Sequence, residues 1–366
     1  MSAQTMKNDE RISLALRSLY AKYGYARYKM SKFEEYELYV RNKDFLISDS
    51  VITFTDTNGK LMALKPDVTL SIVKNSRDIP GYVQKLYYNE NVYRVSSGTH
   101  SFKEIVQLGL ECIGDIDDYC IFEVLQLAAE SLRQISDQCV LNISHLGVIS
   151  ALLEGVDTES RQKIIACIRE KNAHELVSAC AAAGIGWRAN ILTQLVTSYG
   201  RPDEVLPRLR SLLGENEAVA QLETLTGAFR DAGLYDMLRI DFSVINDVNY
   251  YNGIVFKGFI EGVPSGVLSG GQYDMLMRKM GRKSGAIGFA VYLDMLERLH
   301  ESERKYDVDV ALIYDEASDI NGLRAAIAKL TAEGMTVTAQ HARPDKLRFR
   351  KLARYSEGEV TILEDA

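Results

Sequence analysis

Apolar residues recur every three or four positions near the start of the chain and take a strand-like pattern further on. The apolar positions of Ile12–Tyr23 have helical spacing, and Gly24 follows them, so we predict an amphipathic helix there. Asn58-Gly59 supplies the positive φ of a tight turn between the first two predicted strands. The expected strands are Val51–Thr55, Leu61–Leu64, Gln84–Arg94, Val106–Ile113 and Cys139–Ile143, with a helix over Tyr119–Ile135. This pattern predicts an antiparallel sheet flanked by helices.

The character of the chain changes between about residues 155 and 235. Apolar residues there keep helical spacing without strand-like alternation, which predicts a helical insertion. Its expected helices are Arg161–Lys171, His174–Ala183, Ala189–Ser198, Glu204–Leu213 and Ala218–Ala232. After it we expect strands Leu238–Val244 and Gly253–Ile260, a Gly-rich corner at Ser269-Gly270-Gly271 and a helix Ala286–Leu299.

The last segment alternates strands and helices, as in a small α/β module. We expect strand Val308–Tyr314, helix Asn321–Glu333, strand Met335–Gln340, helix Lys346–Tyr355 and strand Glu359–Leu363. The charged stretch Glu301–Lys305 is the expected linker. We therefore divide the chain into a core of residues 1–303, insertion included, and a C-terminal α/β domain of residues 304–366.

Composition limits the class of protein. With 366 residues, 46% of them apolar and 25% charged, the chain can bury a full core and is not a disordered or fibrous protein. A formal net charge of −7 argues against a broadly cationic coat for nucleic acid. No apolar run approaches the roughly 20 residues of a membrane span, and Met1–Arg11 lacks the apolar core of a signal peptide. We expect a soluble, cytoplasmic protein with no membrane partner.

Cysteine and histidine positions give no sign of a metal site. The five cysteines form no C-x-x-C arrangement and are interpreted as reduced, mostly buried thiols. The five histidines are scattered, without a spacing that puts two of them on one face beside a carboxylate. We expect neither a metal nor another cofactor.

A first candidate site lies at Lys65-Pro66-Asp67-Val68-Thr69. Pro66 rigidifies the chain just before a carboxylate and a hydroxyl, and a fixed carboxylate at a strand end can receive an ammonium group. The alternative is that Asp67 only caps the turn that opens the next helix.

A second candidate is Gln107-Leu108-Gly109-Leu110-Glu111. In a strand, positions 107, 109 and 111 share one face, so Gln107 and Glu111 point together across the space that Gly109 leaves. Such a pair predicts the floor of a pocket. A buried carboxylate needs a cation or strong donors, and Arg94 could supply a purely structural salt bridge instead.

Two further segments could contact a ligand. Neighbouring tyrosines in a strand face opposite ways, so one of Tyr250 and Tyr251 can pack in the core while the other offers its ring and hydroxyl to a planar ligand. The segment Ser269-Gly270-Gly271-Gln272-Tyr273-Asp274 permits close backbone approach.

Taken in order, these segments resemble the catalytic core of histidyl-tRNA synthetase, over roughly Ile12 to Leu299. The matching stretches are Phe54-Thr55-Asp56 through Pro66-Asp67-Val68-Thr69, Tyr93-Arg94 through Gln107 and Glu111, Asn249–Phe256, and Gly270–Asp274 with Ala286-Ile287-Gly288-Phe289-Ala290. The resemblance implies an α+β fold of the class II aminoacyl-tRNA synthetase type. It also implies that Asp67 and Gln107 hold the α-ammonium of histidine with help from Thr69, that Glu111 and Tyr250 bind the imidazole, and that Tyr251 walls the pocket.

Several positions depart from that family's pattern. Asn246 stands where the family has the arginine that faces the substrate carboxylate, and Met295 stands where it has the arginine that grips the triphosphate. Ser31 replaces the proline of motif 1, Gln272 replaces another arginine, and the basic residues of the motif 2 loop have thinned to Lys103. Arg94 remains as a possible contact for a ligand carboxylate or another anion. The resemblance thus implies a retained histidine pocket without the groups that handle ATP.

This combination is similar to the family of ATP phosphoribosyltransferase regulatory subunits, as is Ser144-His145-Leu146-Gly147-Val148. It implies a non-catalytic subunit of histidine biosynthesis that binds free histidine and pairs with a short catalytic phosphoribosyltransferase, as a homodimer inside a hetero-oligomer. The main alternative is a histidine–tRNA ligase, for which tRNA would bind to the basic run Arg343, Lys346, Arg348, Arg350, Lys351 and Arg354, most of it in the last expected helix. We favour a solvated or partner-docking helix there. A kinase-associated pseudo-synthetase is a third alternative, with no kinase motif to support it.

Overall fold

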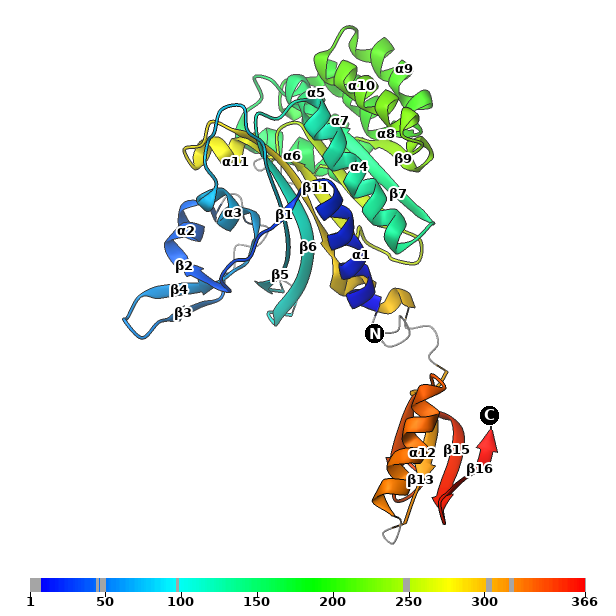
Figure 1. Ribbon diagram of the computed structural model, residues 1–366. Coiled ribbons are helices and arrows are strands. Elements are labelled where there is room, and N and C mark those ends of the chain that lie inside the picture. Colours follow the sequence, from blue (N-terminus) through cyan, green and yellow to red (C-terminus); the bar gives the residue numbers. More distant parts are fainter. Residues whose placement is uncertain are drawn as a thin grey trace. The chain divides into compact units, whose positions relative to one another are not determined.

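The computed structural model describes residues 8–43, 46, 51–96, 99–245, 251–300, 305–315 and 319–365. The chain divides into two units, Met1–Glu297 and Arg298–Ala366. Among the described residues, no helix combines the length and apolar character needed to cross a membrane. Each unit has its own sheet, as Figure 1 shows.

A nine-stranded sheet organises the first unit, in the order β1-β5-β6-β12-β11-β10-β7-β9-β8. Its pairings are antiparallel except for β1 with β5 and β7 with β9. The strands in sheet order are β1 (Ala26–Arg27), β5 (Gln84–Val95), β6 (Phe102–Gly114), β12 (Gly285–Tyr292), β11 (Leu268–Gln272), β10 (Ile254–Ile260), β7 (Cys139–His145), β9 (Leu238–Asp241) and β8 (Tyr199–Gly200). The predicted sheet with flanking helices is therefore confirmed.

Two helices, α1 (Asn8–Lys22) and α4 (Asp118–Ile135), cover one face of this sheet. The α4 helix begins where Asp117 accepts a hydrogen bond from the amide of Cys120, at 2.8 Å. Its apolar stripe packs on the sheet, and α1 presents the fully buried Tyr20 to the ring of Phe289, with centroids 6.0 Å apart. The other face of the central strands is left to the cavity described below.

A smaller sheet and two short helices lie beside the end of the large sheet. Strands β2 (Phe33–Glu35), β4 (Leu61–Leu64) and β3 (Thr53–Thr55) pair antiparallel, and the β3–β4 turn uses Gly59 at φ 78°, as the Asn-Gly signal predicts. The helices are α2 (Tyr36–Arg41) and α3 (Thr69–Asn75), and a further short helix, α11 (Asp274–Lys279), packs with them.

The segment expected to be a helical insertion is helical. After α5 (Leu146–Leu152), it contains α6 (Thr158–Arg169), α7 (Ala173–Ala182), η2 (Gly186–Arg188), α8 (Ala189–Thr197), the two-residue strand β8, α9 (Pro202–Leu213) and α10 (Glu217–Asp231), and η3 (Tyr235–Met237) follows at its end. Side-chain caps begin several of these helices: Asp157 accepts from the amide of Ser160 at α6, and Asn216 accepts from two amides at α10.

The second unit is a four-stranded sheet, β14-β13-β15-β16, with one helix against it. Its elements are β13 (Val308–Ile313), α12 (Ile320–Ala332), β14 (Val337–Gln340), β15 (Phe349–Ser356) and β16 (Glu359–Asp365). Val310, Leu312, Ala353 and Tyr355 form its small core.

Three local predictions were wrong. The helix expected over Ala286–Leu299 is strand β12 followed by the 3-10 helix η4 (Leu293–His300), and the corner expected at Ser269-Gly270-Gly271 lies inside strand β11. The helix expected over Lys346–Tyr355 is mostly strand β15, so the basic residues do not share a helix face.

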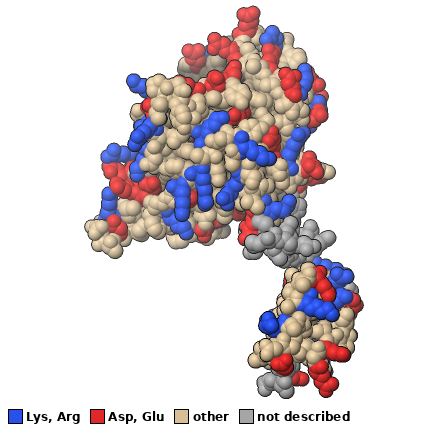
Figure 2. All heavy atoms as spheres, in the orientation of Figure 1, with Lys and Arg blue, Asp and Glu red and all other residues tan. Residues whose placement is uncertain are grey.

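Figure 2 shows acidic and basic side chains on the visible face of both units.

Candidate functional site

The floor of the cavity is the sheet face that α1 and α4 leave open. Pairing puts Gln107 of β6 opposite Tyr292 of β12, and Glu111 of β6 opposite Gly288 of β12. Gln107 and Glu111 both line a cavity of about 780 Å³, as strand periodicity predicts. The space expected at Gly109 is filled, because a Cβ there would lie 2.6 Å from the hydroxyl of Tyr88.

Glu111 is a buried carboxylate held by two hydroxyl groups. Its side chain is 2% exposed; Thr69 Oγ1 donates to Oε1 at 2.8 Å and Tyr273 OH donates to Oε2 at 2.6 Å. Burial raises the pKa of Glu111 to about 8, against the opposing effect of these two hydrogen bonds, and nearby Asp67 adds to the rise. No ion pair of Glu111 with a lysine or arginine occurs within the described part of the chain.

Close packing keeps this carboxylate in place. A Cβ on Gly288, in the neighbouring strand, would overlap Oε2 of Glu111 and lie 2.6 Å from its Cδ. Among the described residues, no ion pair joins Glu111 to Arg94, so the structural salt bridge considered from the sequence is not formed. The donors that Glu111 requires come from Thr69 and Tyr273 instead.

Asp67 both caps a helix and lines the cavity. Its Oδ1 accepts from the amide of Leu70 at 2.9 Å, which fits the capping alternative, while its side chain faces the cavity. Burial raises the pKa of Asp67, and the charge of Arg94 opposes that rise. The segment is anchored two residues before Asp67, where the fully buried Lys65 forms an ion pair with Glu90 at 2.9 Å.

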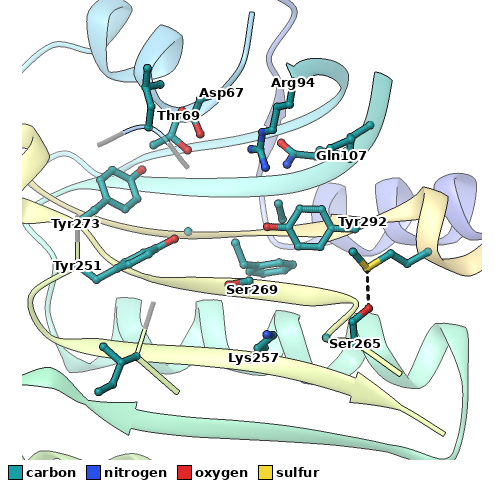
Figure 3. A pocket seen from close by; sticks show the side chains of 18 of the residues that line it. Asp67, Thr69, Arg94, Gln107, Tyr251, Lys257, Ser265, Ser269, Tyr273 and Tyr292 are labelled. Atoms are coloured by element: carbon teal, nitrogen blue, oxygen red, sulfur yellow. Dashed lines mark hydrogen bonds between the residues drawn. The ribbon is translucent and has the colours of Figure 1, made fainter. Parts of the chain in front are cut away.

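Arg94 reaches the cavity from β5. Its Nε donates to the carbonyl of Pro66 at 3.0 Å, and its buried Nη2 has no hydrogen-bond partner among the described residues. Burial raises the pKa of Tyr292, and the charge of Arg94 opposes that rise, so the guanidinium lies near this phenol. Figure 3 shows Arg94 and Gln107 on one side of the cavity with Tyr292 below them. An anion in the cavity could accept a hydrogen bond from Nη2 of Arg94.

Other walls include residues that the sequence analysis gave no role. Tyr251 lines the cavity, whereas Tyr250 and Asn246 lie outside the described residues. Tyr273 belongs to the candidate segment Ser269–Asp274, but no role of its own was predicted for it. From the insertion, α6 contributes Gln162, Ile165, Ala166 and Arg169, and the lining also includes Lys257, Ser265, Ser269, Asp294 and Met295. No sequence spacing ties α6 to the sheet, because its position depends on tertiary packing.

The far end of the cavity has a different chemistry from the Glu111 end. Ser265 donates to Sδ of Met295 at 3.4 Å, so the thioether stands beside a loop at this end. Among the described residues, no group of three metal-ligating side chains occurs. The end with Glu111 and Asp67 offers carboxylates, an amide, aromatic rings and the guanidinium of Arg94, and Lys257 adds an ammonium group across the cavity.

Comparison with known proteins gives the family. A sequence model of histidyl-tRNA synthetase matches residues 1–296. The chain belongs to this family. Among curated relatives, an ATP phosphoribosyltransferase regulatory subunit from Clostridium kluyveri is 25% identical over 360 residues, which is 94% of this chain and 92% of the relative. The subunit of the same name from Oceanobacillus iheyensis is 27% identical over 284 residues, 75% of this chain and 69% of the relative.

Solved structures of the histidyl-tRNA synthetase family share the fold. An ATP phosphoribosyltransferase regulatory subunit/histidyl-tRNA synthetase from Bacillus halodurans has a TM-score of 0.74 at 24% identity, covering 91% of this chain and 88% of that one. A chain of the ATP phosphoribosyl transferase (HisG:HisZ) complex from Thermotoga maritima has a TM-score of 0.62 at 18% identity, covering 79% of this chain and 98% of that one. The class II synthetase-like fold expected from the sequence is confirmed.

Proposed function

We propose that this protein is a cytoplasmic, non-catalytic regulatory subunit of ATP phosphoribosyltransferase, at the first step of histidine biosynthesis, and that it senses free histidine in the cavity. The names of the curated relatives support the role in histidine biosynthesis. The observation that carries histidine sensing is Glu111, a buried carboxylate whose hydrogen-bond donors are neutral and whose cavity also contains Asp67 and Gln107.

In this proposal, the imidazole of histidine hydrogen-bonds to Glu111. A carboxylate oxygen can accept more than one hydrogen bond, so Thr69 and Tyr273 orient the group without exhausting it. The α-ammonium lies between Asp67 and the side-chain oxygen of Gln107. Thr69 is the first residue of helix α3 and lies two residues after Asp67. Its hydrogen bond to Glu111 therefore holds the segment with Asp67 in place beside the α-ammonium.

The outer parts of the ligand meet the remaining predicted residues. Tyr251 forms a wall for the imidazole, and Tyr250, outside the described residues, is proposed to assist Glu111. The free Nη2 of Arg94 is available to the carboxylate of histidine.

The absence of synthetase catalysis is part of the proposal. The resemblance implies that Met295 and Asn246 occupy the places where the synthetase pattern has arginines. Loss of a charge-assisted donor costs about 1.5–3 kcal/mol, and two such losses at developing charge lower a rate by roughly 10²–10⁴-fold. We therefore expect no useful formation of histidyl-adenylate.

The proposed partner is the short-form catalytic phosphoribosyltransferase subunit, with this chain as a homodimer in a hetero-oligomer. The complex from Thermotoga maritima, whose fold this chain shares, supports a partner of that kind. Histidine can shift such an assembly only as far as it binds one of its states more tightly than the other.

Calorimetric titration of histidine into wild type and Glu111→Ala tests the sensing site. We expect binding to wild type and at least tenfold weaker binding to the variant, since a buried hydrogen-bonded contact is lost. Glu261→Ala is the matched control, because Glu261 is exposed and does not line the cavity. Equal affinity of Glu111→Ala and wild type would exclude this pocket.

A histidine–tRNA ligase remains the second candidate, and the family match over residues 1–296 favours it. A paired assay separates the two functions. The regulatory proposal expects restored phosphoribosyl transfer on mixing with a short catalytic subunit and no pyrophosphate exchange with histidine and ATP; the opposite pair of results would establish the ligase.

A further inference from the structure

Lys257 lies in a row of residues that crosses the cavity floor. It pairs with Ser269 of β11, which pairs with Ala290 of β12, which pairs with Gly109 of β6. Directly paired residues share a sheet face, so Lys257 lies on the same face as Gln107 and Glu111. Three steps of about 4.8 Å place the backbone of Lys257 about 14 Å from β6.

The floor between these strands is low. Ser269 and Ala290 are small, and both line the cavity together with Lys257. Figure 3 shows Lys257 below Ser269, across the cavity from Arg94 and Asp67. The cavity is therefore open from the acidic end at Asp67 to the ammonium of Lys257.

The side chain of Lys257 is supported along its stem. A Cβ on Gly266 would lie 2.8 Å from Cγ of Lys257, so the glycine makes room for the aliphatic chain. The ammonium lies 5.6 Å from the ring centroid of Phe259, at the outer range of a cation–π contact. Among the described residues, no hydrogen bond or ion pair to this ammonium is present.

The charge around Lys257 favours an anion. Arg169 of α6 brings a second positive charge to the cavity, which Asp294 also lines. A partly buried ammonium gains most from a charged acceptor, because charge-assisted hydrogen bonds are about twice as strong as neutral ones. A ligand oxyanion is such an acceptor.

We propose that Lys257 is a ligand-binding residue whose ammonium receives an oxyanion at the end of the cavity opposite Glu111. Two sources share this chemistry: the carboxylate of bound histidine, received by Lys257 in place of Arg94, and a phosphate group of a second small molecule bound beside it. The first source rests on the proposed function, whereas the second does not.

The test uses Lys257→Met, which keeps the length of the stem and removes the charge, with Lys283→Met as the control on an exposed turn outside the cavity. L-Histidine, histidinol and inorganic pyrophosphate are titrated separately into the full-length protein by calorimetry. Histidinol differs from histidine by carrying a hydroxymethyl group in place of the carboxylate.

We expect Lys257→Met to weaken one interaction by about 10- to 100-fold. Weaker histidine binding with unchanged histidinol binding assigns the carboxylate, and weaker pyrophosphate binding with unchanged histidine binding assigns a separate phosphate. Lys257→Arg should retain the affinity, and it also serves if the methionine variant fails to fold. Affinities within twofold of wild type for all three probes, or no binding of any probe to wild type, would overturn the assignment. Pyrophosphate binding that depends on Lys257 in a protein that ignores histidine would overturn only the sensing proposal.

Discussion

The buried carboxyl of Glu111 makes the stability of the fold depend on pH in an unusual direction. Its pKa is about 8 in the folded protein and ordinarily 4.5. Between these two values the folded state holds a proton that the unfolded state has released, so the free energy of unfolding falls as pH rises. The contribution is fully present below about pH 4.5 and is lost as pH passes through about 8.

The size of this effect follows from the two pKa values. At 1.36 kcal/mol for each pH unit, the interval corresponds to about 5 kcal/mol between pH 4.5 and pH 8. Glu111→Gln mimics the protonated acid, because the amide keeps the size of the side chain and still accepts a hydrogen bond from Thr69 or Tyr273.

Urea unfolding from pH 5 to pH 9 measures the difference between the two proteins. We expect wild type and Glu111→Gln to be close in stability at pH 5, and the variant to be more stable by several kcal/mol at pH 9. Titrating groups that do not interact with Glu111, such as His145, affect both proteins equally and cancel in the difference. Parallel stability curves over this range would refute the argument that Glu111 is protonated in the fold.

Three further substitutions test the structure, the first two beside the site and the third in a helix away from it. Lys65→Met leaves Glu90 without its partner in a buried ion pair, so it should lower the free energy of unfolding by about 3–5 kcal/mol in urea denaturation. The double variant with Glu90→Gln should recover part of this loss. Gly288→Ala pushes a methyl group against Glu111 and should cost about 1–3 kcal/mol and weaken histidine binding; unchanged values for both would contradict the packing described. Gly227→Ala, in the interior of α10 with open space around it, should instead raise the melting temperature through a gain of about 0.5–1 kcal/mol.

Hydrophobic periodicity predicted most elements of the first unit because their two sides differ in polarity. It failed at Ala286–Leu299, where β12 is a central strand with a nearly continuous apolar sequence, and such a run does not distinguish a strand from a buried helix. It also failed at Lys346–Tyr355. That segment is a strand because it pairs with β13, which lies more than 30 residues earlier, and with β16, which follows it. The pattern within the segment itself does not contain these pairings.

Local sequence patterns predicted some residues of the candidate site and missed others. Gln107 and Glu111 lie four residues apart on one face of a strand, so local alternation was enough to bring them together. The bond from Tyr273 to Glu111 spans 162 residues, and Lys257 reaches the same cavity through three strand pairings. No local pattern carries that information.

The row of Gly109, Ala290, Ser269 and Lys257 sets the length of the cavity across the sheet. Neighbouring strands are about 4.8 Å apart, and each strand contributes one residue to the row. A bulky residue at Ser269 would shorten the longest molecule that fits, and one at Ala290 would shorten it further. The choice of ligand could thus be changed by evolution, or in the laboratory, one residue at a time while the surrounding fold stays the same.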